Sequence, residues 1–120
     1  MPTPTKAHKI IDKIFICLDV ADPTKLKFVD TNGVDAKAAH VKRGKKLVFF
    51  SRVAAFAICF NKGYGSPSAT ETGLFGEKGK DAALQISSDT FENQQFHYSV
   101  CLFIDGKQPI CEDPQIIITS

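Results

Sequence analysis

The sequence predicts an all-β protein, an antiparallel β-sandwich built from short strands. Over residues 96–104 every even-numbered side chain is apolar or aromatic, which is the two-residue period of a strand with one face on a core. The same period occurs over residues 14–20 and 56–60, and we expect the 96–104 and 56–60 strands to face each other from opposite layers. No long stretch has helical periodicity, so an α/β fold is not expected.

Composition is consistent with a single globular domain. The chain has 120 residues, 43% of them hydrophobic, which suffices for one core without disulfides or metals. We therefore expect one sandwich domain over residues 1–120, with residues 1–12 as a loose lead-in. Ten phenylalanines among twelve aromatic residues also favour pleated, half-buried surfaces.

Charge and hydropathy argue against two classes of partner. The chain carries 15 basic and 13 acidic side chains, a net charge of +2, so no nucleic-acid partner is expected. No apolar run approaches the roughly 20 residues that cross a bilayer, so no membrane partner is expected. The first residues lack the features of a secretory leader. The chain is therefore expected to be cytoplasmic, and a mature secreted form stays open.

Turn residues divide the first half of the chain into five expected strands. Pro23 ends the first strand, Asn32-Gly33 favours a tight turn, and Gly44 lies in a basic turn. The fourth strand is almost wholly apolar, so we expect it to be central and protected in the fold. The expected strands span residues 14–20, 26–30, 38–42, 47–50 and 54–60.

The second half contains a long segment without strand periodicity. Residues 61–81 hold five glycines and many small polar side chains, and we predict a loop. A loop of this length in a small domain is usually functional or mobile. Strands are expected after it at residues 84–88, 96–104 and 115–119, with a turn at Asp105-Gly106.

Four cysteines occur without a Cys-x-x-Cys pair, at positions 17, 59, 101 and 111. One interpretation is that all of them are small, structural thiols in a reducing compartment. In the other interpretation, Cys101 and Cys111 face each other across a hairpin at Asp105-Gly106 and form a disulfide. The sequence leaves both interpretations open.

Several motifs in the chain occur together in one protein family. In chain order they are the strand-Gly-Lys-Lys-strand unit of residues 38–50, the strand of residues 56–60, Ser66-Pro67, Tyr98-x-Val100, Gly106 and the stretch of residues 113–118. In order and spacing this resembles small bacterial cupredoxin-like sandwich proteins over about residues 36–119. The resemblance implies a Greek-key sandwich, and an immunoglobulin-like topology is the alternative.

A resemblance to the blue-copper members of that family would also imply a redox site. Such a site takes two histidines, one cysteine and a weak axial ligand, usually methionine. Cys101 is near the corresponding place in the chain, but no histidine follows it and the only methionine is Met1. We therefore assign no metal ligands and no cofactor.

No catalytic motif is recognisable, so enzymatic activity is not predicted, although distant positions that converge in the fold stay open. We predict a non-catalytic binding or assembly module that recognises a protein or a small ligand, with a homo-oligomer left open. Its contact residues are expected in the glycine-rich loop, since loops on rigid scaffolds commonly carry recognition. They are Tyr64, Leu74, Phe75, Lys78 and Lys80. The alternative is a metal or thiol redox protein with a non-standard site at Cys101, Cys111 and His97.

Overall fold

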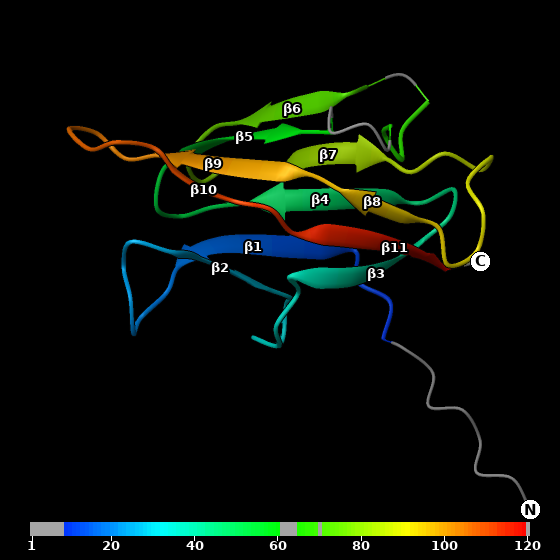
Figure 1. Ribbon diagram of the computed structural model, residues 1–120, viewed down its shortest axis with the longest axis horizontal. Helices are drawn as coiled ribbons and strands as arrows, with labels where there is room; N and C mark the ends of the chain where they lie inside the picture. Colours follow the sequence, from blue (N-terminus) through cyan, green and yellow to red (C-terminus); the bar gives the residue numbers. More distant parts are fainter. Residues whose placement is uncertain (1–8, 61–64, 70, 120) are drawn as a thin grey trace, which may run out of the picture.

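The computed structural model describes residues 9–60, 65–69 and 71–119, and these residues form eleven strands and no helix (Figure 1). In chain order the strands are β1 (Lys13–Leu18), β2 (Leu26–Val29), β3 (Ala38–Lys42), β4 (Lys46–Phe50), β5 (Ala55–Cys59), β6 (Gly73–Gly76), β7 (Ala82–Gln85), β8 (Gln95–His97), β9 (Ser99–Phe103), β10 (Ile110–Glu112) and β11 (Gln115–Thr119).

The strands form two layers. The first has the order β2-β1-β4-β7, and the second contains two hydrogen-bonded groups, β10-β9-β5-β6 and β3-β11-β8. One long hairpin joins these two groups, because β8 continues into β9 and β10 into β11 (Figure 1). Gln115 pairs with His97, and Tyr98 N donates to Pro114 O at 3.1 Å in the same register. The second layer therefore extends from β3 through the hairpin to β5 and β6.

The predicted fold class, an all-β sandwich, is confirmed. Neighbours within each layer are mostly distant in the chain, so long connections join many adjacent strands. The pairing is mostly antiparallel, but β1 pairs parallel to β4, and β3 pairs parallel to β11. The alternation of apolar residues did not reveal these two parallel pairs, because both kinds of ladder share the two-residue period.

The core lies between the layers and is filled by the side chains that the alternation placed inward. Tyr98 is fully buried, and its ring centroid lies 5.0 Å from that of Phe60 and 5.9 Å from that of Phe49 on β4. One expectation was wrong, since β5 and β9 do not face each other from opposite layers. They are neighbours in the same layer, where Ile58 pairs with Val100, and the layer facing them contains β4.

Two strands lie where none was expected. Strand β6 falls inside the predicted loop, and β10 is a three-residue partner of β9. In β6 only Leu74 and Phe75 are apolar, and glycines flank them, so no periodicity is visible in the sequence. Strand β4 was placed correctly, because β1 and β7 pair with it on both sides and its Leu47 and Phe49 are buried.

Gly76 in β6 is required by close packing. A Cβ atom at this position would overlap Cζ of Phe56, whose ring is completely buried. Phe56 and Gly76 are paired across β5 and β6, so the ring covers the glycine backbone. The contact places the strand that carries Phe75 against the core.

The Tyr98 hydroxyl is buried without a hydrogen-bond partner among the described residues. Burial raises the pKa of Tyr98 far above its ordinary value, because a phenolate would be desolvated there. The unfolded chain releases this proton near pH 10, whereas the folded chain retains it. The contribution of Tyr98 to the free energy of unfolding is therefore fully present below about pH 10. Above that pH the contribution falls by about 1.4 kcal/mol per pH unit.

We expect Tyr98→Phe to be as stable as the wild type at neutral pH, or about 1 kcal/mol more stable, since it removes an unsatisfied buried hydroxyl. In alkali the variant should lose less stability than the wild type, because it lacks this titration. Urea unfolding of both proteins at about pH 7 and about pH 11 measures the difference. An identical alkaline loss in the two proteins would contradict the assignment.

Candidate functional site

Two aromatic side chains lie on the outer surface of the second layer. Phe75 on β6 is 66% exposed and Phe103 on β9 is 38% exposed. Their ring centroids are 6.4 Å apart, and the ring planes are inclined by 25°, so the rings stack. Strand β5 runs between them, with Ala55 paired to Phe103 and Ala57 paired to Phe75. We call Ala55, Ala57, Phe75 and Phe103 the aromatic face.

The small side chains of β5 explain why the rings can meet. In a sheet, side chains on one face of neighbouring strands lie about 5 Å apart, so two residues separated by a whole strand normally do not touch. Alanines leave room for each ring to lean over β5. The result is an apolar surface made of two rings above two methyl groups.

A shallow hollow of about 430 Å³ adjoins this surface. Lys78, from the turn after β6, and Asp105, from the turn after β9, both line it. The aromatic face therefore has both a positive and a negative side chain at its border. The residues that line the hollow are Val53, Ala54, Ala55, Lys78, Phe103, Ile104 and Asp105.

The structure brings together two of the five contact residues predicted from sequence, Phe75 and Lys78. Leu74 is turned to the interior and packs against the core. Lys80 is exposed and pairs with Glu77 at 3.0 Å in the turn after β6. Tyr64 lies outside the described residues. Phe75 belongs to a strand rather than to the expected loop, which corrects that prediction.

Sequence reasoning missed Phe103 as a member of the aromatic face. It has outward parity in the strand after Tyr98, and its neighbours of the same parity, Ser99 and Cys101, are small or polar. A large apolar side chain at a position expected to face water is the signal that could have identified it. Its stacking on Phe75 was not foreseeable, because the two residues belong to strands that are not adjacent.

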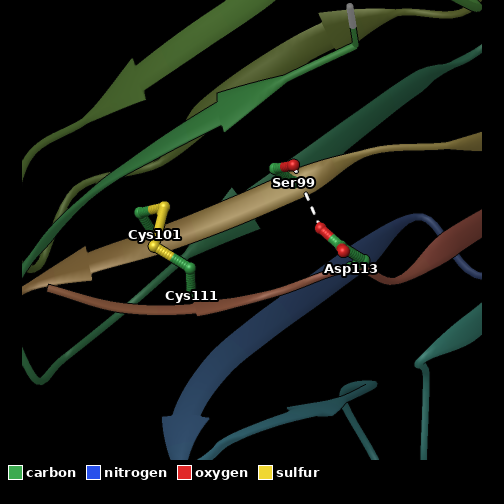
Figure 2. Close-up of a disulfide and its surroundings, with 4 residues drawn as sticks. All are labelled: Ser99, Cys101, Cys111 and Asp113. Atoms are coloured by element: carbon green, nitrogen blue, oxygen red, sulfur yellow. Dashed lines mark hydrogen bonds between the residues drawn. A yellow bond between two sulfur atoms is a disulfide. The ribbon is translucent and has the colours of Figure 1, made fainter. Parts of the chain in front are cut away.

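A disulfide joins the two strands of the long hairpin. Cys101 on β9 and Cys111 on β10 are directly opposite, with Cα atoms 4.1 Å apart (Figure 2). On the same hairpin, Ser99 Oγ donates to Asp113 Oδ1 at 3.0 Å. The interpretation in which Cys101 and Cys111 form a disulfide is therefore confirmed. The interpretation in which both are structural thiols is wrong. The hairpin brings them together because the turn at Asp105-Gly106 lies midway between them.

The disulfide bears on the alternative of a metal or redox site at Cys101, Cys111 and His97. Disulfide sulfurs carry no thiolate, which is the form that binds metals and attacks electrophiles. Within the described ranges, no three side chains of His, Cys, Asp or Glu come together as a metal-binding group. Cys17 and Cys59 are free and half-buried, and burial raises the pKa of the Cys17 thiol.

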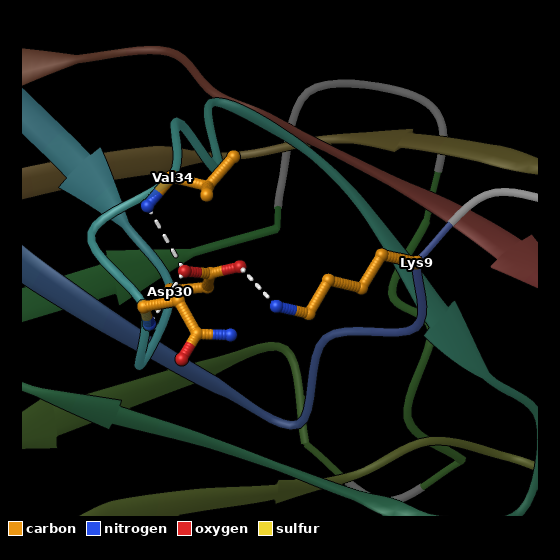
Figure 3. Close-up of polar contacts among 4 residues, drawn as sticks. Lys9, Asp30 and Val34 are labelled. Atoms are coloured by element: carbon orange, nitrogen blue, oxygen red, sulfur yellow. Dashed lines mark hydrogen bonds and ion pairs between the residues drawn. The ribbon is translucent and has the colours of Figure 1, made fainter.

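Asp30 is a buried carboxylate, only 4% exposed, and therefore the first acidic residue to consider for a catalytic role. Its Oδ1 accepts hydrogen bonds from Asn32 N at 2.8 Å and Val34 N at 3.0 Å, and Oδ2 lies 3.4 Å from Lys9 Nζ (Figure 3). These contacts, the Val34 bond first, lower the pKa of Asp30. The carboxylate therefore holds the tight turn at Gly33 and acts as a structural group.

Among the described residues, no helix has the length and apolar character needed to span a membrane. Comparison with protein-family models, with curated proteins and with solved structures found no match to this chain.

Proposed function

We propose that this chain is a non-catalytic binding module that uses the aromatic face as its contact surface. The observation that carries the proposal is the stacked pair Phe75 and Phe103, exposed above two alanines. Covering a phenylalanine ring removes apolar surface from water and contributes about 1.5–3 kcal/mol. Aromatic side chains are accordingly enriched in the centres of protein interfaces.

The shape of the surface favours a protein partner over a small ligand. Small-molecule sites are concave and enclose most of the ligand. The aromatic face instead lies on the outside of a sheet, with Lys78 and Asp105 at its border. An apolar centre with a charged border is the usual anatomy of a protein–protein contact.

The cupredoxin-like relationship belongs to the same proposal. The two-layer, all-β sandwich supports it as the scaffold. The alternative of a metal site at these cysteines gains no support, because the sulfur atoms of Cys101 and Cys111 are bonded to each other and carry no thiolate. We therefore propose a binding function that uses no cofactor.

The location of the protein is also a proposal. The sequence favoured the cytoplasm and left a mature secreted form open. The Cys101–Cys111 disulfide supports the second location, because disulfides persist in oxidising compartments and are rare where thiols are kept reduced.

Photo-crosslinking at the aromatic face tests the binding function. A photoreactive phenylalanine analogue in place of Phe75 is expected to give covalent adducts with a partner protein in the cells that naturally make this chain. The same analogue in place of Val20, which is 96% exposed in the turn after β1, is the matched control and should give few adducts. Adducts are identified by mass spectrometry.

A Phe103→Ser substitution should lower the yield of adducts from position 75, because it removes the ring that stacks on that side chain. No adducts from position 75, or equal yields from positions 75 and 20, would contradict a contact surface at this place.

A further inference from the structure

Strand β10 is held to the rest of the protein by few apolar contacts. Among the eleven strands of the described chain, it is the only one in which no residue is buried. Only Ile110 packs against the core, and it is partly exposed. The strand pairs with β9 over three residues and ends its hydrogen-bonded group. Segments with so few buried contacts open locally at a low cost in free energy.

The disulfide between Cys101 and Cys111 is the covalent link that fixes β10 to β9. The side chain of Glu112 adds an ion pair with Lys37 at 3.8 Å, but both groups are partly exposed, so this pair contributes little. Strand β9, in contrast, also pairs with β5 over five residues, and its Val100 is completely buried. Breaking the disulfide therefore loosens β10 and leaves β9 in place.

The two sulfur atoms of the disulfide differ in access. Cys111 is exposed, whereas Cys101 is half-buried. A thiolate that breaks a disulfide approaches one sulfur along the extension of the S–S bond, and the other sulfur departs. The bond crosses from β9 to β10 (Figure 2), so attack on Cys101 has to come over β5, where Ala57 is its paired residue. Attack on Cys111 comes from the outer side of β10, where no strand of the described chain pairs.

We infer that the Cys101–Cys111 disulfide is a redox-sensitive clasp, which a dithiol reductant opens in the folded protein to release β10. A thiolate of the reductant bonds to Cys111 Sγ, the S–S bond breaks, and Cys101 leaves as a thiolate that takes up a proton. The second thiolate of the reductant then attacks the mixed disulfide, and Cys111 leaves and is protonated. The reductant gives up two electrons and becomes a disulfide, and both cysteines become thiols. This inference is independent of the proposed function.

The release of β10 reaches the border of the aromatic face. Strands β9 and β10 are the two legs of a hairpin whose turn contains Asp105. Asp105 lines the hollow beside Phe103. In the oxidised protein both legs of this turn are fixed, whereas in the reduced protein only the β9 leg is. The element with two states is therefore β10, and the redox state of the two cysteines selects between them.

Amide hydrogen exchange of the full chain, with and without dithiothreitol, tests the release of β10. Dithiothreitol is expected to reduce the disulfide in the absence of denaturant and to make exchange over β10 about ten-fold faster or more. Exchange over β11 should not change, because β3 and β8 pair with it on both sides. The matched control carries Cys101→Ala with Cys111→Ala. Its β10 should exchange rapidly from the start and should not respond to dithiothreitol.

Two results of this experiment would overturn the inference. One is a disulfide that resists dithiothreitol at every urea concentration below the unfolding transition. The other is an equal acceleration of exchange in β5, β10 and β11, since the disulfide would then hold the whole domain and not one strand. Circular dichroism of the reduced protein distinguishes local release from unfolding.

Two single variants test which sulfur is attacked. Cys101→Ser leaves Cys111 as a thiol, and Cys111→Ser leaves Cys101 as a thiol. With dithionitrobenzoate, the Cys111 thiol should react about ten-fold faster than the Cys101 thiol, because it is more accessible. The free thiols of Cys17 and Cys59 are present in both variants and provide the same background. Equal rates, or a faster reaction of Cys101, would overturn the assignment of Cys111 as the attacked sulfur.

Discussion

Phe56→Ala is expected to lower the free energy of unfolding by about 3–5 kcal/mol. The Phe56 ring is completely buried on β5, where it pairs with Leu102 on one side and Gly76 on the other. Its loss removes apolar burial and leaves a cavity between the layers. Urea unfolding measures the change, and an effect below about 1 kcal/mol would contradict this place for the ring.

Gly76→Ala should cost about 1–3 kcal/mol in the wild type, since its Cβ would overlap the Phe56 ring. In a Phe56→Ala background the same methyl group has room, so the second substitution should cost little. A double-mutant cycle therefore gives a coupling of about 1–2 kcal/mol. Ile116→Ala, another buried site on a different strand, is the control, and it should combine additively with Gly76→Ala. If the effects of Phe56→Ala and Gly76→Ala on the free energy of unfolding were additive, the contact between the Phe56 ring and Gly76 would be refuted.

Replacing both bonded cysteines, Cys101→Ala with Cys111→Ala, should lower the free energy of unfolding by about 2–3 kcal/mol. The disulfide closes a loop between residues ten apart in the chain, so its loss frees the unfolded hairpin. Cys59→Ala changes a free, half-buried thiol and should cost less than about 1 kcal/mol. Urea unfolding under non-reducing conditions measures both.

Thiol titration gives the chemical counterpart of this experiment. The denatured protein should show two reactive thiols, Cys17 and Cys59, before reduction, and all four cysteines after it. Four thiols in unreduced protein purified from its natural compartment would remove the disulfide. The support for an oxidising location would be lost with it.

Several parts of the molecule could be predicted from residues close together in the chain. The inward faces of β4 and of the strand around Tyr98 follow from alternating side chains, and the turn at Gly33 follows from Asn-Gly chemistry. The candidate site was predicted in part. Phe75 was identified because it lies in an unusual glycine-rich segment, whereas Phe103 was missed because it lies in an ordinary strand.

The sequence by itself determined the all-β class and the side of each long strand that faces the core, because a two-residue period is a local property of the backbone. Only the tertiary structure decided which strands are neighbours. It placed β5 beside β9, joined Cys101 to Cys111 and stacked Phe75 on Phe103. Such contacts join segments remote in the chain, and their choice depends on the packing of all strands at once.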